Sequence, residues 1–456
     1  MLWLVSLAHA VRPTEGGMWA FDDTDVVTTV DSPTGTARVW YSTDGPNAVK
    51  AGDDDADGVP DFAQSVAAYT EDVLVFYEEA GFRPPVSDEG RGGDDAMDVY
   101  LVDFGGNADG AYTAENCDTV GTATQCDGYF VMENDFAGYG YSDVDTAIRV
   151  LTSHELFHAV QAAYDAGEGV WLSEGTAVWA EQLYDPLNED FVAFCDAYLD
   201  DTARSLNEPP TGPVPTFAYA TAIWWWFLSN RYGDDVIVEL MEATETSEDE
   251  DATLAAMAAV EEARGGSLAE DFATFARWNL ATGSRAGVAE SYPFAEDIGG
   301  IRPDYSGESI SDENRFYPLA TTYMKVDHEG GPLAFATAEA SPDLVFSLHA
   351  TEDEKITDQL AEWQDDADLG DLDAGIYWIV AVNPTLAENS TKVLFCAGPD
   401  VSACAGEDTG DTGKPPAADD TGEDDPGPGC GCDAGGGVAG AWLLVLASLA
   451  TRRRRA

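Results

Sequence analysis

Two histidines and two glutamates stand at a spacing that could hold a metal ion and do hydrolytic chemistry. His154 and His158 are four residues apart, and Glu155 directly follows the first histidine. On a helix, residues four apart share a face, so both imidazoles can reach one ion while the Glu155 carboxylate projects beside them. We predict that the third ligand is Glu174. Imidazole nitrogen with carboxylate oxygen suits a catalytic zinc ion, which keeps a fourth position open for water.

Each of these residues has a specific role in the predicted chemistry. Zinc lowers the pKa of bound water from about 15.7 toward 7, and Glu155 would take the proton and later pass it to a leaving amine. Glu181 shares a helix face with Glu174 and would orient a histidine by accepting its second N–H. A zinc site without catalysis would have little need for Glu155. We therefore predict a zinc hydrolase.

Helices are expected to position this motif. Ser142, with Asp145 three residues later, indicates an N-terminal cap. Apolar residues then recur near helical spacing at Val144, Ile148, Leu151 and Phe157. A second, shorter helix is expected to start near Ser173 and to carry Glu174 and Glu181 on one face.

The segments 154–161 (HELFHAVQ) and 171–181 (WLSEGTAVWAE) resemble the gluzincin metallopeptidases, most of all secreted metalloproteases of myxobacteria and their relatives. The resemblance spans residues 36–240 and is strongest at the metal motif. The metzincin pattern is absent, because His158 is followed by Ala159, Val160 and Gln161 rather than by the required glycine and third histidine.

The resemblance implies a zincin-like catalytic domain with Zn²⁺ and a polypeptide substrate. It also implies that a downstream tyrosine stabilises the oxyanion of the tetrahedral intermediate. Tyr219 stands at a suitable position, although a core aromatic on a buried helix is an equally good interpretation. In such peptidases an edge strand binds the substrate backbone, and residues 129–132 are our candidate by analogy.

The overall charge is strongly acidic. With 21 basic and 86 acidic residues, the formal net charge is −65. Such a surface repels nucleic acid and anionic membranes, so neither is an expected partner. The acidity would suit a high-salt habitat, and it would equally suit a general need for solubility in a secreted protein.

Both ends of the chain indicate export. Residues 1–10 contain a short apolar run and a small-x-small site, which we interpret as the remnant of a signal peptide with a start codon placed too late. Residues 398–429 form an acidic linker rich in Pro, Gly and Thr. Residues 430–456 contain Cys430, Cys432, an apolar stretch and four arginines, and they resemble a myxobacterial-type C-terminal sorting signal. The resemblance implies attachment at the cell surface or outer envelope, with a plain tail anchor as the alternative.

Cysteine spacing agrees with an oxidising compartment. We predict disulfides between Cys117 and Cys126 and between Cys396 and Cys404, each closing a short loop. Cys195 is left over and is expected to be a buried thiol.

An acidic loop between residues 53 and 61 is a candidate for structural Ca²⁺. Asp53, Asp55, Asp57 and Asp61 occupy positions 1, 3, 5 and 9 of a calcium-loop pattern. Gln64 stands where an EF-hand has glutamate, so the last ligand stays unidentified. A solvated acidic turn is the alternative interpretation.

The predicted fold class is α+β, a zincin-like catalytic domain over residues 11–298 followed by a small all-β, sandwich-like domain over 299–397. Strands are expected at 26–30, 37–42, 97–104 and 128–132, and in the second domain at 316–326, 333–338, 343–350, 375–383 and 392–396. Helices are expected at 62–80, 223–232, 236–242, 252–264 and 268–279. Three consecutive tryptophans, 224–226, cannot share one helical face, and core packing is favoured over sugar binding. His328 and His349 lie in the β-rich region without a ligand pattern.

Two function classes remain open at this point. The first is a zinc endopeptidase outside the cell or at its surface. The second is a non-catalytic surface binding or adhesion protein with a vestigial zinc site. The sequence predicts neither the cleavage preference nor the oligomeric state.

Overall fold

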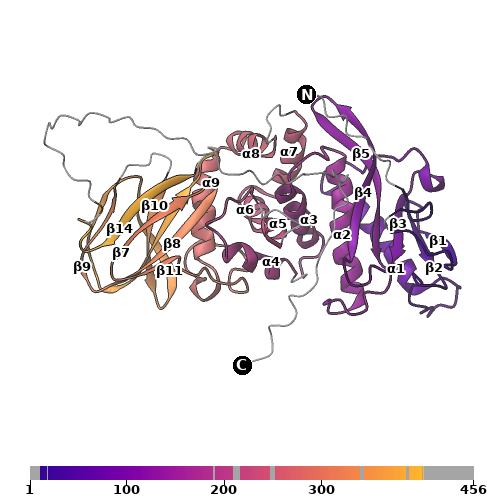
Figure 1. Cartoon of the computed structure of the whole chain (residues 1–456), viewed down its shortest axis with the longest axis horizontal. Coiled ribbons are helices and arrows are strands. Elements are labelled where there is room, and N and C mark those ends of the chain that lie inside the picture. Colours follow the sequence, from indigo (N-terminus) through magenta and orange to yellow (C-terminus); the bar gives the residue numbers. More distant parts are fainter. Residues whose placement is uncertain are drawn as a thin grey trace, which may run out of the picture.

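The computed structural model describes residues 11–17, 19–187, 190–208, 216–246, 252–338, 344–386, 390–402 and 404. Over these ranges the chain is a mixed α+β protein with three β-sheets. Three parts follow one another along its long axis: an N-terminal sheet with two helices, a central group of helices, and a C-terminal pair of sheets (Figure 1). The predicted segments 1–10 and 430–456, with Cys430 and Cys432, lie outside the described residues, as does all but the start of the linker.

The N-terminal sheet has five strands in the order β1-β2-β3-β5-β4. These are β1 (Val27–Asp31), β2 (Ala37–Ser42), β3 (Met97–Val102), β4 (Gly110–Val120) and β5 (Ala123–Glu133). The pairs β1/β2 and β4/β5 are antiparallel, whereas β3 is parallel to both β2 and β5. The predicted hairpin and buried strands are confirmed. The prediction that residues 129–132 form an edge is wrong, because β5 lies between β3 and the strand β4, which occupies the edge.

Helices cover one face of this sheet and then form the centre of the molecule. Among the described residues they are α1 (Asp61–Glu79), α2 (Val144–Ala162), α3 (Val170–Tyr184), α4 (Asp190–Leu199), α5 (Thr216–Ala220), α6 (Ala222–Tyr232), α7 (Asp235–Thr244), α8 (Ala252–Ala263) and α9 (Leu268–Leu280), with short 3₁₀ turns at Arg91–Gly93 and Gly283–Arg285. None of these helices is both long and apolar enough to cross a bilayer. The helix carrying the metal motif is confirmed, but its N-cap is Asp143, which accepts a hydrogen bond from the Thr146 amide, and not Ser142.

The opposite face of the sheet is covered by the start of the described chain. Trp19 packs against Phe104 at 4.4 Å between ring centroids. Arg12 is only 2 % exposed and forms ion pairs with three carboxylates, those of Asp88, Asp98 and Glu115. A buried guanidinium with several carboxylate partners is compensated in charge and hydrogen bonding, so this segment belongs to the folded core.

The C-terminal region is rich in β-strands, as predicted, and its two sheets share one apolar core. Its strands are β6 (Tyr305–Gly307), β7 (Ile310–Phe316), β8 (Ala320–His328), β9 (Gly331–Thr337), β10 (Val345–Glu352), β11 (Lys355–Trp363), β12 (Ala367–Leu372), β13 (Gly375–Asn383) and β14 (Thr391–Gly398). One sheet has the order β11-β10-β13-β8-β6 and the other β12-β9-β14-β7. Residues from both sheets, such as Phe346 and Phe395, meet in one cluster, which makes this region a sandwich.

The sandwich sheet with the order β11-β10-β13-β8-β6 packs on the helices with the face that points away from the other sandwich sheet. Tyr323 of β8 donates a hydrogen bond to the carbonyl of Ala276 in α9 at 2.9 Å. The Arg285 guanidinium lies over the Trp378 ring at 4.8 Å. His349 is buried on the same strand face as Ser347, with which it is hydrogen-bonded at 2.9 Å. The apolar core is therefore continuous from the helices into this sheet.

Both predicted disulfides are present. Cys117 and Cys126 join β4 to β5, and Cys396 is bonded to Cys404. Cys195 is a buried free thiol, as expected.

Candidate metal centre and active site

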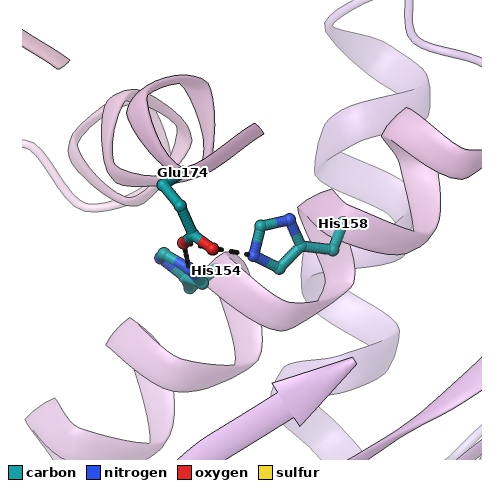
Figure 2. A group of neighbouring side chains, drawn as sticks. All are labelled: His154, His158 and Glu174. Carbon is teal, nitrogen blue, oxygen red and sulfur yellow. Dashed lines mark hydrogen bonds and ion pairs between the residues drawn. The ribbon is translucent and has the colours of Figure 1, made fainter. Parts of the chain in front are cut away.

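Helices α2 and α3 bring the three predicted zinc ligands together. His154, His158 and Glu174 each offer one ligand atom, and these atoms lie within 4.8 Å of one another. The Glu174 Oε2 atom is 3.3 Å from His154 Nε2 and 3.6 Å from His158 Nε2. Figure 2 shows both imidazoles directed at this carboxylate from neighbouring turns of one helix. The grouping is the one expected from the spacing of the motif.

A close contact between α3 and α6 sets the position of Glu174. Gly175 packs so tightly there that an added Cβ would lie 2.2 Å from Thr221 Oγ1 and 2.5 Å from Trp225 Nε1. The Thr221 hydroxyl donates to the carbonyl of Trp171 at 2.7 Å, which joins the start of α3 to α6. α3 starts at Val170, three residues before the expected start, so Glu174 lies within its first two turns.

Each histidine has a hydrogen-bond partner on its other ring nitrogen. His154 Nδ1 lies 2.6 Å from Glu181 Oε1, the partner predicted on the same face of α3 as Glu174. His158 Nδ1 lies 2.8 Å from Gln161 Oε1. The role of Gln161 was missed from sequence, although its position three residues after His158 places it on the same side of the helix. Such partners fix the orientation of a metal-binding ring.

The Glu155 carboxylate lies beside the ligands without a hydrogen-bond partner within the described part of the chain. Both of its oxygens are buried, and the residue is 1 % exposed. Gly110 at the start of β4 makes room for it, since a Cβ there would lie 2.7 Å from Glu155 Oε1. Burial, together with the charges of Glu174 and Asp109, raises the pKa of Glu155 to about 7. Asp109, which accepts a hydrogen bond from Tyr141 at 2.8 Å, was not predicted as part of this environment.

The electrostatics of the site favour a positive charge between the ligands. Burial alone would lower the pKa of His154, but hydrogen bonds with Glu174 and Glu181 raise it well above its usual value. Burial alone would raise the pKa of Glu174, yet His158 and His154 lower it to about 2. Two imidazoles and a carboxylate that stabilise a cation in a buried place fit the ligand set of zinc.

Tyr219 lies next to the ligands and is also part of the core. Its ring centroid is 5.9 Å from that of His154 and it stacks on Phe194 at 5.4 Å. Burial, then the charges of Glu174 and Glu155, raise the pKa of Tyr219 well above its ordinary value, so the hydroxyl keeps its proton. Both interpretations of this residue therefore agree with its position. The tryptophans 224–226 pack in or against the core, as favoured from sequence.

The acidic loop before α1 also brings carboxylates together. One oxygen each from Asp53, Asp55 and Asp61 lie within 4.8 Å of one another. Asp57 is not in this group, and its Oδ2 accepts a hydrogen bond from Gln64 at 2.8 Å. The predicted calcium site thus retains three of its four candidate ligands as a group, and calcium binding stays a prediction.

Comparisons with known proteins add no assignment. No protein-family model matches the chain, and no curated protein matches it. The gluzincin resemblance accordingly depends on the motif residues and their geometry.

Proposed function

We propose that this protein is a zinc-dependent peptidase of the gluzincin type that acts outside the cell or at its surface. The observation that carries the proposal is the convergence of His154, His158 and Glu174 beside Glu155, whose carboxylate has no hydrogen-bond partner among the residues that the structure describes. A structural zinc site is normally closed by four protein ligands, whereas three ligands and an adjacent general base are typical of a hydrolytic site. The two disulfides support an oxidising location.

The chain's own residues would divide the reaction among them. A bound zinc ion supplies a Lewis acid that acidifies water and polarises the scissile carbonyl. Glu155 takes the proton of the attacking water and returns it to the leaving amine. Tyr219, which keeps its proton, donates a hydrogen bond to the developing oxyanion.

The sheet edge nearest this centre suits an extended polypeptide. β4 forms the edge of the N-terminal sheet, and its first residue, Gly110, touches the Glu155 side chain. A substrate strand added to β4 would run next to the proposed base, because edge strands offer free main-chain hydrogen-bonding groups. β4 therefore replaces residues 129–132 as the strand that we propose for substrate binding.

One observation favours the alternative of a non-catalytic binding protein. His154, Glu155, His158 and Glu174 are each 4 % exposed or less. A polypeptide reaches such a centre only after the surrounding elements move apart, whereas a metal that serves structure alone needs no such opening.

Zinc content and hydrolysis of an unstructured protein distinguish the two functions. Wild type, Glu155→Gln and the exposed-site control Glu262→Gln are compared for bound zinc and for cleavage of casein. We expect one zinc in all three, with cleavage lost only in Glu155→Gln, by about 10²–10⁴-fold as is usual for removal of a general base. Tyr219→Phe, measured beside them, should lower the rate and leave zinc content unchanged.

Bound zinc without cleavage by any form would favour the binding protein. Absence of zinc from the purified and zinc-supplemented wild type would contradict the zinc peptidase and would leave only a binding protein whose zinc site is vestigial.

A further inference from the structure

The Gln161 side chain connects one metal-binding histidine to the helix that carries the third ligand. Gln161 lies in the last turn of α2 and is 7 % exposed. Its Oε1 atom is 2.8 Å from His158 Nδ1. Its Nε2 atom is 2.8 Å from both the Ser173 carbonyl and the Thr176 hydroxyl of α3. Ser173 directly precedes Glu174 in the sequence.

These contacts determine which way the amide of Gln161 points. A main-chain carbonyl can only accept, so the group facing Ser173 must be the NH₂ group. The Thr176 hydroxyl donates to the Leu172 carbonyl at 2.8 Å, and its oxygen is therefore available to accept the second N–H of Gln161. Reversing the amide would place two acceptors against each other at Ser173. The carbonyl oxygen of Gln161 consequently faces His158.

This orientation in turn selects one tautomer of His158. An amide oxygen has no proton to give, so His158 Nδ1 must donate the hydrogen bond and carry the proton. The neutral ring then has its lone pair on Nε2, the atom that faces Glu174 at 3.6 Å. Of the two neutral tautomers of His158, the contacts of Gln161 therefore select the one whose Nε2 atom can bind a metal ion.

The partner of His158 is neutral, whereas the partner of His154 is the carboxylate of Glu181. Three carboxylates, those of Glu155, Glu174 and Glu181, are already buried around the ligands. A glutamate at 161 would add another, and one of its oxygens would face the Ser173 carbonyl. An amide avoids that repulsion and still accepts from the histidine, because it carries an acceptor and a donor at opposite positions.

We propose that Gln161 is a positioning residue of the metal centre: it fixes the Nε2-binding tautomer of His158 and holds that histidine at a set distance from Glu174. The first part concerns the metal-free protein, and the second rests on the zinc site of the proposed function. Partners of this kind contribute about 10–100-fold to metal affinity.

The test uses the full chain with two variants and one matched control. Gln161→Leu removes both sets of hydrogen bonds at similar volume, and Gln161→Glu keeps the acceptor for His158 but loses the donor to Ser173. Gln182→Leu is the control, because Gln182 is a glutamine of α3 that is 2 % exposed and donates to the carbonyl of Pro186 at 2.9 Å. Thermal unfolding of the metal-free forms shows how much each change costs in folding alone.

The first readout needs no metal. Long-range ¹H–¹⁵N NMR of histidine-labelled metal-free protein, at about pH 8 where an ordinary histidine is neutral, distinguishes the two imidazole tautomers. We expect His158 to be protonated at Nδ1 in wild type, Gln182→Leu and Gln161→Glu, and to populate both tautomers in Gln161→Leu. Nε2 protonation in the wild type, or an unchanged tautomer in Gln161→Leu, would overturn the proposal.

The second readout is zinc affinity, measured by competition with a chromophoric chelator. We expect about 10–100-fold weaker binding for Gln161→Leu, an intermediate loss for Gln161→Glu and no change for Gln182→Leu. Equal losses in Gln161→Leu and Gln182→Leu would mean that packing alone is responsible and would overturn the positioning role. A wild type that shows the tautomer effect but binds no zinc would remove the proposed function and leave the role of Gln161 in fixing His158 intact.

Discussion

Replacing Gly175 by alanine tests whether the contact between α3 and α6 sets the metal geometry. The added Cβ would lie 2.2 Å from Thr221 Oγ1 and 2.5 Å from Trp225 Nε1. Neither neighbour can withdraw easily, because both are fully buried and the Thr221 hydroxyl is bonded to the Trp171 carbonyl. Non-bonded heavy atoms rest at about 3.5–4.0 Å, so α3 has to move away from α6 by about 1 Å.

The expected effect on stability is smaller than the effect on metal binding. Overpacking by one methyl group costs about 1–3 kcal/mol, and alanine returns about 1 kcal/mol through its higher helix propensity. The net destabilisation of the metal-free Gly175→Ala protein should therefore be about 0–2 kcal/mol. Glu174, the residue before Gly175, would move with α3. A displacement of about 1 Å at a positioned catalytic group can cost about 10²-fold in rate, and we expect a loss of the same order in zinc affinity.

The assay combines chemical denaturation of the metal-free protein with zinc competition. Gly375→Ala provides a control, because its added Cβ would meet only the Tyr377 ring at 3.8 Å, an ordinary contact. Gly175→Ala should bind zinc about 10²-fold more weakly than the control variant does. Wild-type zinc affinity in Gly175→Ala, with no loss of stability, would show that α3 and α6 can accept a methyl group between them without moving Glu174, and it would refute the reasoning.

Three further predictions concern a partner of one metal ligand, a buried ion-pair cluster and the acidic loop before α1. Glu181→Leu should lower zinc affinity by about 10–100-fold, and unchanged affinity in chelator competition would contradict its role. Arg12→Ala should lower the free energy of unfolding by about 3–5 kcal/mol, because it leaves buried carboxylates unpaired. Replacing the exposed Arg302 by alanine should cost less than about 1 kcal/mol. Equal urea midpoints for the two variants would contradict this prediction. Calcium should raise the thermal midpoint of the wild type and not of the Asp53→Asn/Asp61→Asn variant, and a wild type insensitive to calcium would disprove the predicted site.

Sequence spacing predicted those parts of the site that lie within one helix or on one helix face. His154 and His158 share a face of α2, and Glu174 and Glu181 share a face of α3, so their grouping required only that the two helices meet. Gln161 and Asp109 could not be assigned in this way. Gln161 lies on the same side of α2 as His158, but its amide also contacts α3, and Asp109 acts from the residue before β4. The sequence does not indicate these contacts between elements.

The strand order was harder to predict than the strands themselves. β4 was not predicted, because polar residues interrupt the apolar ones in the segment 110–120 (GAYTAENCDTV) and its register shifts between Ala114 and Cys117. Residues 129–132 were proposed as the edge by analogy with known peptidases, and β4 occupies that position instead. β6, β7 apart from its last residue, β11 and β12 also lie outside the expected strand runs, because charged and other polar residues interrupt their apolar ones. Pairing with neighbouring strands defines them.

The apolar core that runs from the central helices into the five-stranded sheet of the sandwich affects how the molecule can be divided into fragments. Tyr323 and Trp378 from that sheet pack in the same cluster as Phe275 of α9. A fragment ending near residue 298 would expose this apolar surface to water, at a cost of roughly 25 cal/mol for each Å² uncovered. The sandwich and the helices are therefore expected to unfold in one cooperative step. Replacing the sandwich by another domain would accordingly require matching changes in the surface of the helices against which it packs.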